Sequence, residues 1–294
     1  MSSTPSASVA PGALNGALDE RELRVQLAAA YRIFDHMGWC ELIWGHISLR
    51  VPGPDHHFLI NPYGLRYDEV RASNLVKIDL DGNLVEPSDH PINPAGFVIH
   101  SAIHEHRDDA HCVMHTHTRA GMAVAALECG LLPISMNGMS FQGHIAYHDF
   151  EGSTLLLEER QKLARDLGAA NALILRNHGL LSVGQSIAEA FLYLYRLESA
   201  CRVQLDAMAC GRELVYPPAP TVERSVRQMR EFAQCAADAV GQLEFEALGM
   251  NFGDRGKRVE EQIHLIRRLW TEELVTFSGQ WHKVSDAGLA PMPL

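Results

Sequence analysis

The sequence contains no long apolar run and no excess of positive charge. None of its apolar stretches approaches the roughly 20 residues that a membrane-spanning helix needs, so we expect no membrane partner. The formal net charge is -11 at pH 7, and no basic patch offsets it. This charge argues against nucleic acid or an anionic membrane surface as a partner. The N-terminus has no basic segment followed by an apolar stretch, so we expect no secretory signal.

The sequence also lacks paired cysteines. Its 6 cysteines show no Cys-x-x-Cys spacing, and most of them lie in apolar or helical contexts. This distribution is typical of small, reduced core residues. We therefore predict a cytoplasmic protein.

The composition of the chain favours an ordinary globular fold. Of the 294 residues, 47% are hydrophobic and 21% are charged, which allows a sizeable core. Residues 1–17 are rich in Ser, Pro and Ala, and we expect them to form a disordered leader. The main domain is predicted over 18–243, followed by a short appended segment over 244–294.

Hydrophobic periodicity predicts an α/β protein. Helical and extended segments alternate, and some neighbours are joined by tight turns while others are joined by helices, which favours layers packed around a mixed or antiparallel sheet. Helices are predicted over 19–38, 95–107, 119–128, 155–167 and 186–208. Extended segments are predicted over 44–51, 57–64, 112–114, 131–136, 144–147 and 172–175. A hairpin with a turn at Asp81 and Gly82 is predicted over 75–85.

Three histidines indicate a metal site. The apolar segment Cys112–Met114 runs into His115 and His117, which share one face of a strand because residues two apart point the same way. A second apolar segment ends in Asn177 and His178, and His178 is the predicted third ligand. Three imidazoles can hold a divalent ion and leave positions open for a substrate. Spacing alone leaves another interpretation open, in which each histidine is a hydrogen-bonded core residue.

Six short motifs occur along about residues 20–215: Gly45–Arg50, Ile60–Gly64, Pro91–Phe97, His115–His117, Ala146–Asp149 and Arg176–Leu180. In this order they resemble the class II aldolase/adducin family. The resemblance implies a three-layer α/β/α sandwich, a homotetramer with its active site at a subunit interface, and a small-molecule substrate. It also implies a divalent metal, usually zinc with iron or manganese as alternatives, held by His115, His117 and His178.

The sequence departs from the family's sugar-phosphate aldolases at one helix. In those enzymes a catalytic acid opens the helix before the metal strand, and Gly96 stands at its place here. Pro94 and Ala95 stand where those enzymes have phosphate-binding serines. Because a phosphate needs several hydroxyl or backbone donors, we do not expect a sugar-phosphate substrate. The pattern is closer to the adducin-like bacterial branch, which includes non-haem-iron enzymes acting on aromatic acids.

These motifs predict a metal-dependent lyase that performs aldol-type cleavage or decarboxylation of a small 2-oxo or 2-hydroxy acid. His100 and Tyr147 are the predicted proton-transfer residues, with His100 ranked first because it shares a helical face with position 96. His148 and His46 lie in the same family motifs and are further candidates. The alternative for His100 is a core histidine between helix and strand. His104, His106 and His111 are expected at the surface. Two other functions remain open: a non-haem-iron oxygenase, and a non-catalytic interaction module of the adducin kind.

The last segment of the chain resembles something else. Residues 244–294 are similar to an internal fragment of luciferase-like flavin monooxygenases, with a helix predicted over 257–270 and a hairpin turning at Ser278 and Gly279. In those enzymes the fragment belongs to an eight-stranded barrel, which about fifty residues cannot close. We therefore predict an appended helix and hairpin without a flavin site.

Overall fold

The computed structural model describes residues 19–152 and 159–232, together with parts of 261–287. The chain divides into two compact units, Met1–Asp238 and Ala239–Leu294. The predicted leader over 1–17 lies outside the described residues, and the predicted domain boundary at 243 remains a prediction.

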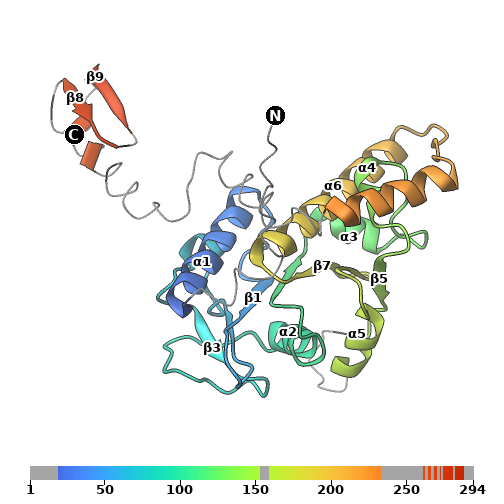
Figure 1. Ribbon diagram of the computed structural model, residues 1–294, viewed down its shortest axis with the longest axis horizontal. Coiled ribbons are helices and arrows are strands. Elements are labelled where there is room, and N and C mark those ends of the chain that lie inside the picture. Colours follow the sequence, from blue (N-terminus) through green and yellow to red (C-terminus); the bar gives the residue numbers. More distant parts are fainter. Residues whose placement is uncertain are drawn as a thin grey trace, which may run out of the picture. The chain divides into compact units, whose positions relative to one another are not determined.

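The first unit is built on a seven-stranded sheet in the order β3-β2-β1-β4-β7-β6-β5 (Figure 1). Its neighbouring strands run antiparallel except for β5 and β6, which run parallel, so the prediction of a mixed sheet is confirmed. The strands are β1 (His46–Arg50), β2 (Phe58–Ile60), β3 (Val76–Ile78), β4 (Cys112–Thr116), β5 (Ile145–His148), β6 (Ala172–Leu175) and β7 (Gly179–Gly184).

Helices cover both faces of the sheet, which gives the predicted three-layer sandwich (Figure 1). One face carries α1 (Glu20–His36), α3 (Arg119–Ala125), α4 (Met136–Ser140) and α6 (Ile187–Ala209). The other carries α2 (Pro94–His106) and α5 (Glu159–Leu167). A 3-10 turn, η1 (Tyr67–Glu69), and a helix over 219–232 complete the described part of this unit.

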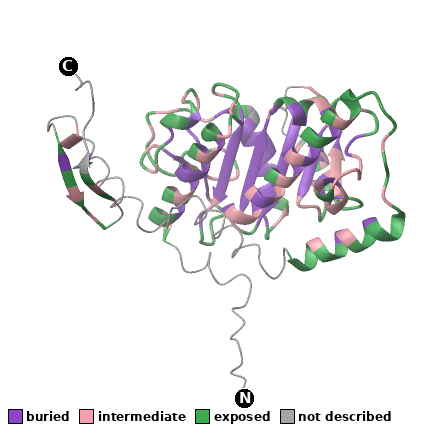
Figure 2. Cartoon of the chain, turned by 90° about the horizontal axis from the view of Figure 1, so that it is seen from above, coloured by how far each residue is buried: buried purple, intermediate pink, exposed green. Residues whose placement is uncertain are grey.

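The central strand β4 divides the core into two. Every residue of β4 is buried, and the buried residues of the sheet form its middle (Figure 2). Met114 packs in the cluster that includes α1 and α6, whereas Val113 packs in the cluster that includes α2 and α5. The alternation of a strand therefore places His115 and His117 on the α2 face, at the end of β4.

One local prediction was wrong, and another is confirmed only in part. The segment 131–136 was expected to be extended, but α4 begins at Met136 because the Ser135 hydroxyl accepts the Gly138 N–H at 3.0 Å and caps a helix. The segment 75–85 was expected to form a full hairpin. Only β3 is a strand there, and Leu84 forms a single isolated bridge with Ile78.

The second unit contains an antiparallel hairpin of β8 (Val275–Ser278) and β9 (Lys283–Ala287), as predicted. The residues described between 261 and 269 are helical, and the rest of the predicted helix over 257–270 lies outside the described residues. Among the helices that the structure describes, none combines the length and apolar composition that a membrane crossing requires.

Tyr31 fixes α1 against β1. Its buried hydroxyl accepts the Ile47 N–H at 2.7 Å and lies 2.9 Å from Asn61 Oδ1. We expect Tyr31→Phe to lower the free energy of unfolding by about 1–3 kcal/mol, because it leaves buried polar groups unpaired. Urea denaturation measures this loss. The control Tyr216→Phe removes a hydroxyl from a side chain that is 53% exposed, and an equal loss there would contradict the prediction.

Candidate metal centre

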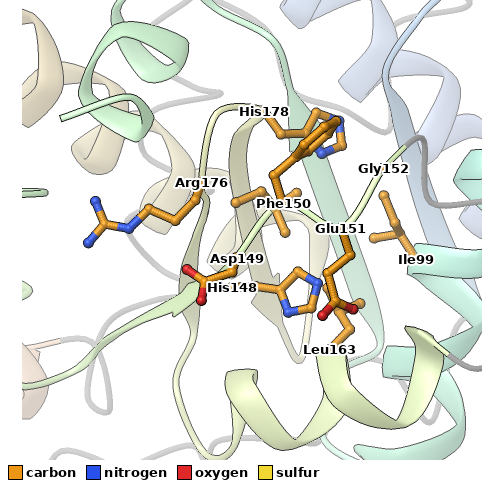
Figure 3. Close-up of a pocket in the computed structure, with 10 residues that line it drawn as sticks. Ile99, His148, Asp149, Phe150, Glu151, Gly152, Leu163, Arg176 and His178 are labelled. Atoms are coloured by element: carbon orange, nitrogen blue, oxygen red, sulfur yellow. The ribbon is translucent and has the colours of Figure 1, made fainter. Parts of the chain in front are cut away.

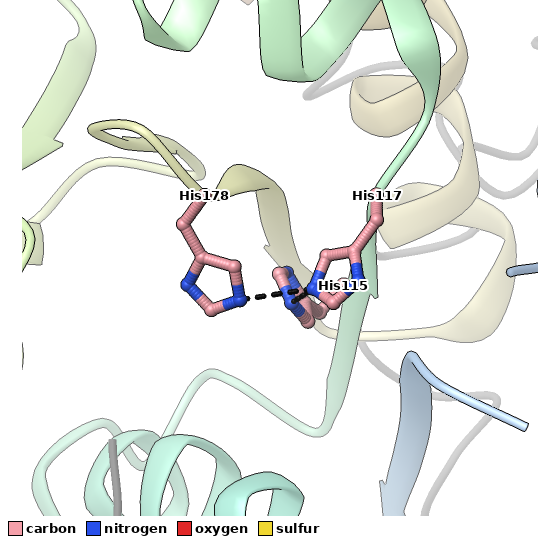
Figure 4. Close-up of side chains that lie close together, drawn as sticks. All are labelled: His115, His117 and His178. Atoms are coloured by element: carbon pink, nitrogen blue, oxygen red, sulfur yellow. Dashed lines mark hydrogen bonds between the residues drawn. The ribbon is translucent and has the colours of Figure 1, made fainter. Parts of the chain in front are cut away.

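The three predicted ligand histidines lie together at the C-terminal end of the central strand β4. The Nε2 atoms of His115 and His117 are 2.8 Å apart, and those of His117 and His178 are 2.9 Å apart (Figure 4). One ring nitrogen from each of the three lies within 4.8 Å of the others. The sequence prediction that these side chains converge is therefore correct.

Two backbone features bring His178 to the end of β4. Asn177 adopts a positive φ of 56° in the turn between β6 and β7, a conformation that asparagine tolerates better than most residues. Gly179 follows, and a Cβ atom there would lie 2.3 Å from the Thr116 carbonyl oxygen. Only glycine permits this close approach of the turn to β4.

Hydrogen bonds at the Nδ1 atoms fix the tautomers of two of these rings. His115 Nδ1 donates to the Leu180 carbonyl at 2.9 Å, and His117 Nδ1 donates to the Glu41 carboxylate at 2.6 Å. In the neutral rings both Nε2 atoms therefore carry lone pairs. Two lone pairs 2.8 Å apart repel each other unless a cation lies between them. The donor set fits a divalent metal, and three imidazoles leave a fourth zinc position open.

Burial keeps the imidazoles of His115 and His178 neutral, which is the form that binds metal. His115 is fully buried, and desolvation followed by the neighbouring His178 and His117 holds its pKa well below the usual range. For His178, burial and then the nearby His117 lower the pKa to about 4. Both rings are therefore unprotonated at neutral pH.

Glu41 bonds one histidine of the triad, and the sequence did not identify it. The carboxylate lies in the loop between α1 and β1, where Leu42 has a positive φ of 52° and the Trp44 N–H donates to the Glu41 carbonyl at 2.8 Å. A carboxylate that accepts from a ligating histidine orients the ring and makes it a stronger ligand. The only sequence signal was an acidic residue just before the Gly45–Arg50 motif.

His46 occupies the space that a side chain at position 96 would need. A Cβ atom on Gly96 would lie 2.4 Å from His46 Cδ2. The His46 ring also stacks on His115, with centroids 5.8 Å apart, and hydrogen-bonds Asn93 Nδ2 at 3.0 Å. The glycine at position 96 is therefore required by the position of the His46 ring on β1.

The two predicted proton-transfer residues do not touch the histidine triad directly. His100 is fully buried, and its Nδ1 atom is 2.6 Å from the Ser48 hydroxyl, with the His46 ring next to it. The Tyr147 hydroxyl accepts the Leu131 N–H at 3.0 Å, away from the triad. Their catalytic roles remain predictions.

The expectation that three further histidines lie at the surface was partly wrong. His104 is 1% exposed and bonds Ser48 and the Ala110 carbonyl, because α2 presses it against β1. His106 is exposed and His111 is half-buried.

A family model for the Class II Aldolase and Adducin N-terminal domain matches residues 25–205. The chain therefore belongs to the class II aldolase/adducin family. A second model, for luciferase-like monooxygenases, matches residues 237–294. This second match falls on the appended segment and covers a small part of the chain.

Three similar proteins show the range of the family. The crystal structure of an aldolase II superfamily protein from Pseudomonas syringae is 46% identical, with a TM-score of 0.69, covering 78% of this chain and 96% of that one. An L-fuculose 1-phosphate aldolase from Glaciozyma antarctica PI12 is 29% identical to this chain, with a TM-score of 0.68. The match covers 84% of this chain and 95% of that one. Alpha-adducin of Rattus norvegicus is 49% identical over 193 residues, which are 65% of this chain but 26% of adducin.

Removing the carboxylate of Glu41 should weaken metal binding. We expect Glu41→Gln to lower zinc affinity by about 10–100-fold, because His117 loses a charged partner that orients it. Competition with a chromophoric chelator measures the affinity. Glu69→Gln is the matched control, since both carboxylate side chains are 48% exposed. Equal affinities for wild type and Glu41→Gln would show that this contact does not support the metal.

The metal-free protein should lose stability in acid. The folded-state pKa of His178, about 4, lies below its usual value of 6.5, so the unfolded chain binds more protons as the pH falls. From pH 7 to pH 5 this one group should remove about 2 kcal/mol of the free energy of unfolding. Urea denaturation in the presence of a chelator measures the loss. His178→Gln should lose less over the same interval, and an equal loss would contradict the assignment.

Proposed function

We propose that the protein is a metal-dependent lyase that breaks a carbon–carbon bond in a small 2-oxo or 2-hydroxy acid. The observation that carries this proposal is the arrangement of His115, His117 and His178, whose Nε2 atoms lie within hydrogen-bonding distance of one another along the cluster. Two of those atoms are lone-pair carriers, which makes the cluster unfavourable without a cation. Membership of a family that contains aldolases supports the reaction class.

The three histidines would hold the metal, and Glu41 would orient one of them. Because the three imidazoles are neutral ligands, a bound divalent ion keeps its full charge and acts as a Lewis acid toward the oxygen atoms of the substrate. Zinc is the metal we propose first, with iron and manganese as alternatives. The choice of a 2-oxo or 2-hydroxy acid over a sugar phosphate rests on position 96. Gly96 supplies no acid, and the His46 ring fills the space that an acidic side chain would need.

Exposed apolar side chains around the triad support an oligomer with its site at a subunit interface. Leu42 is 72% exposed beside Glu41, and Trp44 is 44% exposed two residues further on. Phe150 is 53% exposed, and its ring centroid is 6.3 Å from that of His178. We propose that these side chains are covered by another copy of the chain in a cytoplasmic homotetramer.

Two other functions compete with the lyase. A ferrous ion in the same site would leave positions open for dioxygen, and the protein would then be an oxygenase. The similarity to alpha-adducin favours an interaction module instead. The convergence of all three histidines supports an enzyme over a module, since a protein without metal chemistry has no need of this arrangement.

Metal analysis and a substrate screen test the proposal. Purified protein should contain close to one divalent ion per chain, and His178→Ala should lose it. Reconstituted protein should release carbon dioxide or an aldehyde from a panel of 2-oxo and 2-hydroxy acids, and chelation should abolish this activity. L-fuculose 1-phosphate is the control substrate and should remain intact. Oxygen consumption during turnover would support the oxygenase, while protein that binds no metal would favour the interaction module.

A further inference from the structure

A second histidine faces the pocket beside the triad. Successive residues of a strand point to opposite faces, so the direction of Tyr147 toward Leu131 leaves His148 pointing the other way. The side chain of His148 is 8% exposed, and it lines a shallow pocket that His178 also lines (Figure 3). Of the two candidates on β5, His148 lines this pocket, whereas the Tyr147 hydroxyl bonds the Leu131 N–H.

The backbone holds this histidine close to the metal turn. β5 and β6 run parallel with His148 opposite Leu175, and the Arg176 N–H donates to the His148 carbonyl at 2.8 Å. His178 follows two residues later. Both imidazoles therefore stand at the carboxyl ends of adjacent parallel strands, where α/β sheets characteristically bind ligands.

Asp166 gives His148 a defined tautomer. Its Oδ2 atom on α5 is 2.6 Å from His148 Nδ1, and a carboxylate only accepts. The Nδ1 atom therefore carries a proton, and Nε2 is the free basic atom of the neutral ring. A carboxylate that orients a histidine beside a reaction site is the usual arrangement for a base that moves protons.

The other charged groups that line the pocket are less suited than His148 to transfer a proton. Glu151 pairs with Lys162. The Arg176 guanidinium lies 4.3 Å from the Tyr147 ring centroid and donates to the Leu127 carbonyl at 2.6 Å. Asp149 lines the same pocket, but carboxylates as a class are weaker bases than imidazoles. Among the residues that line this pocket, His148 has the chemistry best suited to proton transfer.

We propose that His148, oriented by Asp166, is the proton-transfer residue of the site, and that the substrate is a 2-oxo acid with a hydroxyl group on carbon 4. This inference rests on the proposed lyase function. His148 Nε2 takes the proton of the substrate hydroxyl as the bond between carbons 3 and 4 breaks, which releases an aldehyde and an enolate. The imidazolium then gives that proton to the enolate carbon: a C–H bond forms, the N–H bond breaks, and Asp166 remains a carboxylate.

A first measurement requires no turnover. Nitrogen-15 NMR of zinc-loaded protein should show His148 protonated on Nδ1 at neutral pH, and Asp166→Asn should weaken this preference. Oxalate, which resembles the enolate of pyruvate, should shift the His148 Nε2 resonance and leave exposed His106 unchanged. A His148 ring protonated on Nε2, or one insensitive to oxalate, would overturn the assignment.

A second measurement follows the proton itself. Zinc-loaded wild type should exchange the methyl protons of pyruvate in D₂O, and His148→Gln should slow the exchange by about 100-fold or more, in the range of general acid–base catalysis. Zinc affinity should change less than twofold, and His106→Gln is the matched control. Exchange that survives in His148→Gln, or zinc affinity that falls with it, would overturn the proposal. If the wild type exchanges no proton, the lyase function fails, and the NMR tautomer and oxalate response alone decide the role of His148.

Discussion

The pairing of β4 with β7 holds together the part of the structure on which function depends. His115 lies opposite Leu181 and Thr116 opposite Leu180 in this ladder, so the carbonyl that fixes the His115 tautomer comes from the partner strand itself. The same pairing presses Gly179 against Thr116. A slip of one residue would turn His115 to the opposite face and separate the ligands. Burial of β4 on both faces makes such a slip costly.

Behind the triad lies a layer of buried, neutral histidines. His104 Nδ1 donates to the Ala110 carbonyl, so its Nε2 accepts from Ser48, which in turn accepts from His100 Nδ1. Burial lowers the pKa of His100 and His46 well below the usual range. An acid introduced at position 96 would collide with His46. A carboxylate at position 96 would therefore require a change on β1 as well as on α2.

The sequence predicted those parts of the site that depend on local periodicity. Alternation along β4 placed His115 and His117 on one face, and the turn before Gly179 supplied His178. It could not predict Glu41 or Asp166, because their partners His117 and His148 lie 76 and 18 residues away and nothing local ties them together. The error at 131–136 has a different origin: Ser135 is a helix cap whose signal is one residue long, and the surrounding apolar pattern outweighed it.

Backbone strain bears on the choice between enzyme and interaction module. In the described part of the chain, non-glycine residues with positive φ are Leu42, His56 and Asn177. Such conformations cost of the order of 1–3 kcal/mol each and persist where the surrounding structure requires them. Leu42 directly follows the carboxylate that orients His117, and Asn177 directly precedes His178. Two of these strained residues therefore adjoin the metal centre, where relaxing either would move Glu41 or His178 away from it. A scaffold that served only to bind a partner would gain stability by relaxing both, so their presence supports a site whose geometry is used in chemistry.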